Sequence, residues 1–347
     1  MSIYDVAKKA GVSISTVSRV LNGSQNVRES TRLKVQAVMK EMHFEPNQLA
    51  RDLSNGNVRN IAYFVPDIEN PFFGKVMHGI NDMARKLDYN IFMVGTNENP
   101  ELEHTELRSL HSGMVKGILI TPVSCYDEET KNILCEYQSN GIPVVLIDRD
   151  ITGSEFDGVF SDDEVGSFNI VDLLAKERHR HIAIIAGPET SRPGYERIRG
   201  YKRAMKANNL SIDPEYMPSG EFCIEESYKA MEHLMNLEVP PTAVFTSNNM
   251  TTLGVLKYMQ EHGLRLCDDI CIGAFDDIPE LVYAGVPLTA VTRDLCKMGS
   301  EAMRILNQRF SQNDESPDSH LVYKSFIKAS LIVRGSEKFR NNSLLSI

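Results

Sequence analysis

Over the first 45 residues, apolar side chains recur at intervals of three and four, which predicts three short helices. Ser2 and Asp5 form a capping box at the first start, Gly11 fits a turn with positive φ, and Ser13 caps the second helix. The apolar positions are Val6, Ala7 and Ala10, then Val17, Val20 and Leu21, then Leu33, Val35, Val38, Met39 and Met42 between Glu29 and Met42. The pattern therefore predicts a small three-helix core.

The second predicted helix leaves Ile14, Ser15, Ser18 and Arg19 on its outer side. A helix that follows a tight turn and presents small polar residues and an arginine is typical of the reading element of a helix-turn-helix DNA-binding domain. An ordinary helical hairpin on a protein surface would have the same apolar spacing.

From Asn60 onward the periodicity changes, because short apolar runs alternate with amphipathic helical segments. The runs are Ile61–Val65, Ile91–Val94, Gly117–Thr121, Val144–Asp148, Ile182–Ala186, Ala243–Ser247 and Cys271–Asp276, and the helices are near 73–87, 101–112, 127–139, 164–177, 195–208, 224–236 and 249–262. This alternation predicts two parallel sheets with helices on both faces. A ligand would then bind between the two lobes, at the carboxyl ends of the strands.

Composition narrows the class of protein. The chain has 347 residues, 42% of them hydrophobic, and no run of about 18 apolar residues that could span a membrane. No charged-then-apolar signal segment precedes the first helix, so we expect a cytoplasmic protein. The six cysteines are scattered without C-x-x-C spacing, which favours reduced structural thiols and no metal site.

The net charge of −10 is unevenly distributed. Residues 1–60 carry nine basic and five acidic side chains, a net charge of +4, so the remainder of the chain carries −14. A basic head on an acidic body is expected if affinity for DNA is confined to one end.

Several motifs resemble those of the LacI/GalR family of bacterial repressors. They are IYDVA from Ile3, AGVS from Ala10 and TVSRVLN from Thr16 in the head, NQLARDL from Asn47 as a hinge helix, and NPFF from Asn70, GAFDD from Gly273 and LTAV from Leu288 in the body. They occur in order over nearly the whole chain. Asp52 departs from the family, in which a small or neutral residue is usual at this position.

The resemblance implies an all-α helix-turn-helix head and an α/β two-lobed periplasmic-binding-protein-like body. We expect the head at 1–45, a hinge helix and linker at 46–59, the effector-binding and dimerisation body at 60–335 and a tail at 336–347. The N-lobe would comprise 60–161 and 291–323, and the C-lobe 162–290 and 324–335, with crossings near 161–163, 290–292 and 322–325.

At the DNA-binding end, the resemblance assigns base reading to Ile14, Ser15 and Arg19 and a minor-groove wedge to Leu53. A dimer-packing role is the alternative for Leu53. The full set of expected DNA-binding residues is Ser13, Ile14, Ser15, Ser18, Arg19, Asn22, Thr31, Ala50 and Leu53. Ser13, Ser18, Asn22 and Thr31 are assigned to phosphates.

The expected effector site combines polar residues at strand ends with an aromatic platform, which suits a polyhydroxylated ligand. Its residues are Asn70, Phe72, Phe73, Thr121, Asp148, Ser191, Arg197, Phe222, Asn248, Asp276 and Arg293. Arg293 replaces the neutral amide usual in the family. If it points into the cleft beside Arg197, it favours an anionic effector such as a sugar acid or sugar phosphate; pairing with Asp294 or a crossover carboxylate is the alternative.

We therefore expect a transcriptional repressor that binds a pseudo-palindromic operator in double-stranded DNA as a homodimer, under control of a sugar-like effector. Control by a purine, a nucleoside or a protein co-regulator is the alternative. A sugar-binding receptor is disfavoured by the head, and an enzyme by the lack of a visible nucleophile, acid–base pair or cofactor motif. No cofactor is expected.

Overall fold

The computed structural model describes residues 2–21, 24, 26–42, 44, 58–110, 113–311 and 321–340. They form two compact units, which divide between Val58 and Arg59, and each unit is considered by itself. The segment predicted as hinge helix and linker, 46–59, lies outside the described residues except for positions 58 and 59.

The head consists of α1 (Ile3–Ala10), α2 (Ile14–Leu21) and α3 (Glu29–Glu41). The capping box of Ser2 and Asp5 is present, and Gly11 ends α1 with a φ of 65°. Val6, Val17 and Val35 are fully buried together, so one residue from each helix meets in the centre of this small core. The predicted three-helix head is confirmed.

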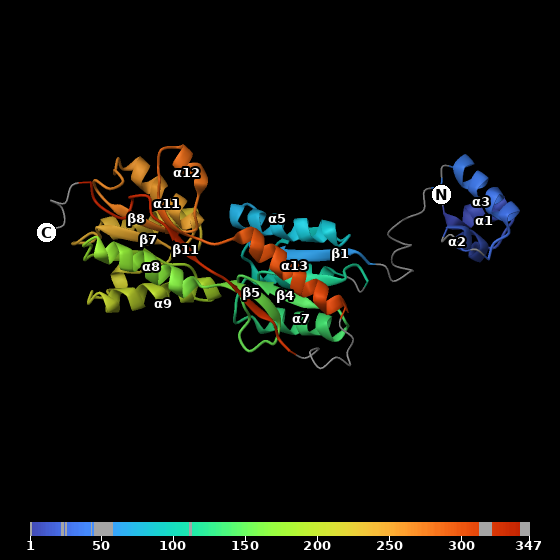
Figure 1. The fold of residues 1–347 in the computed structure, drawn as a ribbon, viewed down its shortest axis with the longest axis horizontal. Helices are drawn as coiled ribbons and strands as arrows, with labels where there is room; N and C mark the ends of the chain where they lie inside the picture. Colours follow the sequence, from blue (N-terminus) through green and yellow to red (C-terminus); the bar gives the residue numbers. More distant parts are fainter. Residues whose placement is uncertain are drawn as a thin grey trace. The chain divides into compact units, whose positions relative to one another are not determined.

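The body contains two sheets, each covered by helices on both faces, as expected (Figure 1). The first sheet has the order β10-β5-β4-β3-β1-β2 and is parallel; the second has the order β11-β9-β8-β7-β6 and is parallel except for β11. The first sheet's strands are β1 (Asn60–Val65), β2 (Asn90–Gly95), β3 (Gly117–Ile120), β4 (Val144–Ile147), β5 (Asp157–Ser161) and β10 (Lys324–Ile327), and the second's are β6 (Ile182–Ile185), β7 (Ala243–Thr246), β8 (Cys271–Phe275), β9 (Thr289–Thr292) and β11 (Ser330–Ile332).

The helices of the body are also divided between the two sheets. On the first sheet α5 (Pro71–Lys86) and α13 (Leu295–Ser311) share a core on one face, and the core of the other face includes residues of α6 (Pro100–Ser109) and α7 (Glu128–Ser139). On the second sheet α8 (Asp163–Lys176) and α9 (Arg192–Ala207) cover one face, and α10 (Ile224–Met235) and α11 (Asn249–Glu261) the other. A 3-10 turn, η1 (Pro214–Tyr216), and a short helix, α12 (Pro279–Tyr283), complete the C-lobe.

The lobe boundaries require correction. The first crossing, near 161–163, follows β5 as expected, but β9 pairs with β8 and β10 pairs with β5. Residues 291–292 therefore belong to the C-lobe and 324–327 to the N-lobe, so the two later crossings come a few residues after the predicted ones. A polar edge strand such as β10, which begins with an exposed lysine, gives little alternation from which to place it.

The predicted tail also begins too early. Ser336 accepts a hydrogen bond from the backbone N–H of Thr289 (2.7 Å) and donates one to the carbonyl of Ile272 (2.6 Å). Phe339 packs against His179, with 5.2 Å between ring centroids. Residues 336–340 are thus part of the C-lobe, and 341–347 lie outside the described residues.

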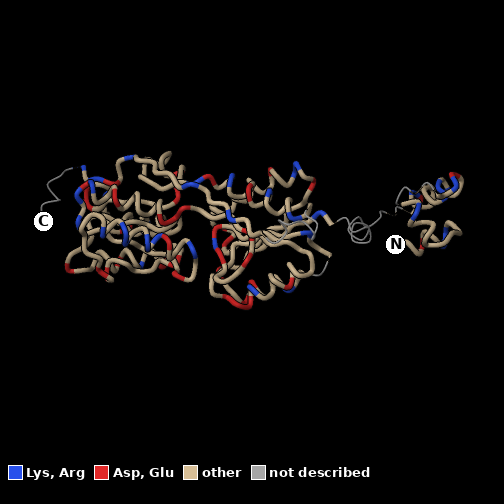
Figure 2. The backbone as a smooth tube through the Cα atoms, turned by 60° about the horizontal axis from the view of Figure 1, so that its bottom comes forward, with Lys and Arg blue, Asp and Glu red and all other residues tan. Residues whose placement is uncertain are grey.

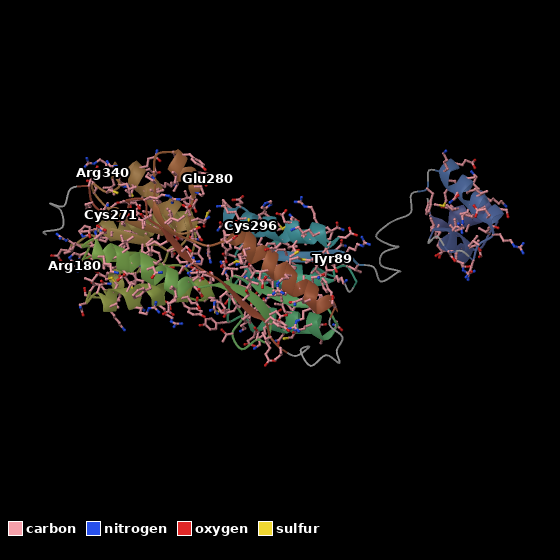
Figure 3. All side chains as sticks on the ribbon, viewed as in Figure 1. Tyr89, Arg180, Cys271, Glu280, Cys296 and Arg340 are labelled. Atoms are coloured by element: carbon pink, nitrogen blue, oxygen red, sulfur yellow. The ribbon has the colours of Figure 1, made fainter. Side chains whose placement is uncertain are left out.

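The six cysteines are free thiols, and they are spread over both lobes: Cys271 lies in the C-lobe and Cys296 in the N-lobe (Figure 3). Basic and acidic positions are interspersed over the body (Figure 2). None of the described helices is both long and apolar enough to cross a membrane.

Candidate functional site

In the head, α2 presents the side chains that the sequence assigns to base reading. Ile14 is 41% exposed, unusually high for an isoleucine, and Ser15 and Arg19 are exposed beside it. The oxygen of Ser13 accepts a hydrogen bond from the backbone N–H of Thr16 (3.2 Å), which fixes the start of the helix. Val17 and Val20 are buried underneath, so the outward face of α2 is available to a partner.

The remaining head residues are less exposed. Ser18, in the middle of α2, and Thr31, in the first turn of α3, are both half-buried. Asn22, Ala50 and Leu53 lie outside the described residues. Their assignments stay predictions.

In the body, a cleft of about 780 Å³ lies between the two lobes. Nine of the eleven predicted effector residues line it: Asn70, Phe72, Phe73, Asp148, Arg197, Phe222, Asn248, Asp276 and Arg293. Asp148, Asp276 and Arg293 each follow directly after a strand, because parallel strands bring their carboxyl ends to one edge of each sheet. The cleft thus gathers residues that are up to 223 positions apart in the sequence, from Asn70 to Arg293.

Thr121 and Ser191 are not among the residues that line the cleft, which corrects two assignments. Thr121 is fully buried, and its backbone N–H continues the β1–β3 pairing by donating to the carbonyl of Phe64 (3.0 Å). Ser191 caps α9: its hydroxyl accepts from the N–H of Gly194 (3.3 Å) and donates to the carbonyl of Pro188 (2.9 Å). The hydroxyl of Ser191 thus serves the fold, whereas that of Thr121 is buried without a hydrogen-bond partner in the described part.

Arg293 forms the centre of an ion-pair network at the floor of the cleft. Its guanidinium lies 2.8 Å from Asp148, 3.1 Å from Asp276 and 3.3 Å from Asp163 and donates to the hydroxyl of Ser161 at 2.6 Å. Asp148 follows β4 in the N-lobe and Asp276 follows β8 in the C-lobe, so one side chain joins both lobes. The alternative that pairs Arg293 with carboxylates is the correct one, although Asp294 is not the partner: it accepts from the N–H of Lys297 at the start of α13.

The other two arginines of the cleft are paired as well. Arg197 donates to Asp163 (3.1 Å) and to the carbonyl of Ser247 (2.6 Å), and its guanidinium carbon lies 3.8 Å from the ring centroid of Phe275. Arg149 holds Glu98 through two bonds of 2.6 and 2.8 Å. Each guanidinium therefore already has a carboxylate partner.

Burial and neighbouring charges shift the pKa values of these groups in opposite directions. Burial raises the pKa of the Asp148 carboxyl, while Arg293 acts to lower it. Burial alone would lower the pKa of Arg293, but the carboxylates of Asp276, Asp148 and Asp163 raise it above the ordinary arginine value. The arginine stays charged, and the network depends on it.

The backbone of the cleft is also unusual. Ten non-glycine residues in the described part have positive φ, and six of them line the cleft: Asn97, Glu98, Asp148, Glu221, Phe222 and Asp276. Left-handed backbone costs about 1–3 kcal/mol at such residues and persists where the surroundings impose it, typically at binding sites. The strain supports a ligand-binding role, and no apolar pattern in the sequence could reveal it.

Hydrogen bonds cross between the lobes around the cleft. The side-chain amide of Asn249 donates to Asn70 (2.8 Å), and the N–H of Cys125 donates to the carbonyl of Thr190 (2.7 Å). Arg192 of α9 donates to Asp150 (2.9 Å). These bonds hold the lobes in the arrangement seen here, so a ligand that changed the lobe angle would have to break or replace them.

Sequence reasoning missed several lining residues. They are Pro66, Asp67, Ile68, Glu69, Asn97, Glu98, Arg149, Pro193, Glu221, Cys223, Ile224, Glu225, Asn249 and Met250. Asn249, Arg149 and Glu221 directly adjoin predicted residues, so including both neighbours of each predicted position would have found them. In the described part, no group of three or more His, Cys, Asp or Glu residues is placed to hold a metal ion.

Comparison with known proteins bears on both units. Residues 2–47 match the family described as "Bacterial regulatory proteins, lacI family", and residues 171–336 match a "Periplasmic binding protein-like domain". The chain is 31% identical to catabolite control protein A of Priestia megaterium over 93% of its own length and 96% of that protein's. This protein belongs to the LacI family.

Other similar LacI-family members are transcriptional repressors. The HTH-type transcriptional repressor PurR of Aliivibrio fischeri (strain MJ11) is 32% identical over 90% of this chain and 93% of its own, and CytR of Escherichia coli (strain K12) is 30% identical over 97% and 96%. The chain is accordingly a DNA-binding transcriptional regulator with an effector-binding body.

Solved LacI-family structures share the fold. A lac repressor dimer bound to operator and the anti-inducer ONPF has a TM-score of 0.76 and 24% identity, covering 97% of this chain and 99% of that one. A CelR–cellobiose complex has a TM-score of 0.72 and 25% identity, with the same coverage. The helix-turn-helix head and two-lobed body expected from the sequence are confirmed.

Proposed function

We propose that this LacI-family protein is a repressor whose α2 helix reads operator bases in the major groove. The observation that carries this proposal is the exposed face of α2, with Ile14, Ser15 and Arg19 outward from a capped and buried helix. A guanidinium can pair with guanine O6 and N7, a contact worth about 1–3 kcal/mol against a wrong base. Ile14 would contact a thymine methyl, while Ser13, Ser18 and Thr31 would bind phosphates.

The hinge contributes the second part of the proposal. Leu53 would enter the minor groove at the operator centre and kink the DNA, with Ala50 beside it and Asn22 on a phosphate. Unstacking a base step costs a few kcal/mol, which contacts to the bent DNA offset. The family resemblance of the sequence from Asn47 to Leu53 supports this role.

The body supports a homodimer that would place two heads on a pseudo-palindromic operator. β2 is the outer strand of its sheet, and Phe92 on it is 51% exposed. In the C-lobe, α12 lies on the outside (Figure 1) and Tyr283 is 84% exposed. Exposed aromatic side chains on both lobes are expected where a second copy covers them. The similar lac repressor structure is described as a dimer.

The effector of the proposed regulator is a small polyhydroxylated molecule that binds in the cleft. Phe73 and Phe222 offer aromatic surfaces, and Asp276, Arg197 and Asn248 offer polar groups for hydroxyls. The paired state of Arg293 removes the reason for expecting an anionic ligand. The similar CelR structure is a complex with cellobiose, a neutral sugar.

Regulation would follow from binding linkage. An inducer must bind the DNA-free state more tightly, and a corepressor the DNA-bound state. Because Asn70–Asn249 and Arg293 join the two lobes, a ligand between them is well placed to change the lobe angle and thereby the spacing of the hinge helices. We propose that the cleft binds its ligand without catalysing a reaction, and that the protein is located in the cytoplasm. In this proposal a protein co-regulator is a further binding partner of the repressor.

A titration of DNA binding tests the proposal. Sugars and nucleosides are first screened for those that raise the melting temperature of the protein. Full-length protein is then bound to a labelled operator selected from random DNA, and these compounds are added to the complex. We expect at least one to change the operator Kd by about fivefold or more. Phe222→Ala should abolish this response, whereas Tyr126→Ala, at an exposed position outside the cleft lining, should retain it. An equal response in both variants would contradict the cleft as the effector site.

A further inference from the structure

The cleft carries an excess of negative charge. Seven carboxylates line it, from Asp67, Glu69, Glu98, Asp148, Glu221, Glu225 and Asp276, against the three guanidinium groups of Arg149, Arg197 and Arg293. The net charge of the lining is therefore −4. A lining that is both concave and of one sign concentrates ligands of the opposite sign.

The positive charges of the lining are already paired with carboxylates. Arg149 is held by Glu98, Arg197 by Asp163, and Arg293 by three carboxylates, at the distances given above. All three residues are at least nine-tenths buried. A phosphate or carboxylate ligand that displaced Asp148, Asp163 or Asp276 from its arginine would leave a buried carboxylate unpaired, which is strongly unfavourable.

The four remaining carboxylates differ from those on the floor. Among the described residues, Asp67, Glu69, Glu221 and Glu225 make no ion pair; their bonds are local, such as that from the Ser219 hydroxyl to Glu221 (2.5 Å). Asp67 and Glu69 follow β1 in the N-lobe, while Glu221 and Glu225 lie before and within α10 in the C-lobe. Carboxylates without an ion pair among the described residues thus line the cleft from both lobes, although Lys229 and Lys257 act on Glu225 from a distance.

Two buried polar atoms at the cleft also lack a partner. The side-chain oxygen of Asn249, a residue 7% exposed, accepts no hydrogen bond, and Nε of Arg197, a residue 2% exposed, donates none. Both residues line the cleft. A buried acceptor and donor without partners are costly unless a ligand or water satisfies them, so they mark where hydroxyl or amino groups of a ligand bind.

We infer that the effector of this protein carries a protonated amine: it is an amino sugar or a similar amine-bearing polyol. The inference rests on the proposed effector site and specifies its ligand. The sugar ring lies against Phe222, its hydroxyl groups satisfy Asn249 and Arg197, and the ammonium group lies among the unpaired carboxylates. Binding of a cation between carboxylates of both lobes also draws the two lobes together.

Matched sets of sugars test this inference on the full-length protein. Each set comprises a hexosamine (D-glucosamine, D-galactosamine or D-mannosamine), its N-acetyl derivative, the parent hexose and the hexose 6-phosphate. Putrescine serves as an amine without a ring. Melting temperature and calorimetric Kd are measured in 50 mM and 500 mM NaCl.

We expect at least one hexosamine to bind about tenfold more tightly than its parent hexose at low salt, and this advantage to shrink at high salt because the carboxylates are solvent-exposed. The double variant Glu221→Gln/Glu225→Gln should remove most of the advantage. Glu226→Gln, on the same helix but outside the cleft lining and paired with Lys229, should keep it.

Three results would overturn the inference: tighter binding of a hexose or its phosphate than of the hexosamine, an equal effect of putrescine, or no binding by any hexosamine. Tighter binding of a neutral sugar that is lost in Phe222→Ala would leave the proposed effector site standing and remove only its cationic ligand. Retention of all sugar binding in Phe222→Ala would instead contradict the proposed site itself.

Discussion

Replacing Arg293 with glutamine, the kind of neutral amide usual at this position in the family, should strongly destabilise the body. The guanidinium is 2% exposed, and its partners Asp148, Asp163 and Asp276 are 10% exposed or less. Without it, Asp148 and Asp276 lose the one ion pair that each makes among the described residues, and Asp163 keeps only Arg197. Removing one partner of a buried ion pair costs about 3–5 kcal/mol.

The loss can be measured by urea and thermal unfolding of the full-length protein at pH 7.5. For a unit of this size the melting temperature should fall by roughly 6–15 °C. Arg304→Gln is a matched control on α13, because that arginine is half-exposed and pairs with Glu301; it should cost less than about 1 kcal/mol.

The stability lost in Arg293→Gln should depend on pH, in a direction set by the pKa of Asp148. Burial already raises the folded-state pKa of Asp148, and loss of Arg293 raises it further. A carboxyl whose pKa is higher in the folded than in the unfolded state destabilises the protein as pH rises through the folded value. The deficit of Arg293→Gln should therefore shrink as pH falls from 7.5 towards 5, and adding Asp276→Asn should restore part of the loss. Equal stability of Arg293→Gln and Arg304→Gln at every pH would refute this reasoning.

Three further predictions concern other parts of the body. Burial raises the pKa of Glu103 to about 7, so the stability that this group contributes is complete below about pH 4.5 and is lost as pH rises through 7. In urea unfolding at pH 8.5, Glu103→Gln should therefore stabilise the protein by about 3 kcal/mol. The control Glu101→Gln, at an exposed position, should not. Arg178 has a φ of 72°, so Arg178→Gly should raise stability by up to about 1 kcal/mol, whereas Arg180→Gly, at a residue without positive φ, should give no gain by the same assay. Phe92→Glu should shift the protein towards a monomer in sedimentation velocity and weaken operator binding; an unchanged mass would exclude β2 from the dimer interface.

The sequence predicted those helices whose ends carry chemical signals. The helix expected at 249–262 is found at Asn249–Glu261, where Asn248 accepts from the N–H of Thr251 (2.7 Å). β5 and β10 were not predicted, because Asp157, Gly158 and Lys324 interrupt the apolar pattern of short strands. α13 was also missed, although its buried apolar residues have helical spacing.

The candidate site was predictable to the extent that it follows from topology. Residues after parallel strands, such as Asp148 and Asp276, reach the cleft because strand ends meet at one edge. The sequence could not show that Arg293 pairs with Asp148, because 145 positions separate them and three carboxylates compete for the same guanidinium. Nor could it show the left-handed backbone of Phe222, which only the folded surroundings impose.

The most direct test of the central claim is selection of bound DNA from a random library by the full-length protein and by Arg19→Ala. The wild-type protein should enrich a pseudo-palindromic site, and the variant should bind with a preference relaxed at one position in each half-site, at a cost of about 1–3 kcal/mol. Circular dichroism should confirm that the head remains folded, since Arg19 is exposed. No enrichment by the wild-type protein, or an identical selected site with Arg19→Ala, would contradict base reading by α2.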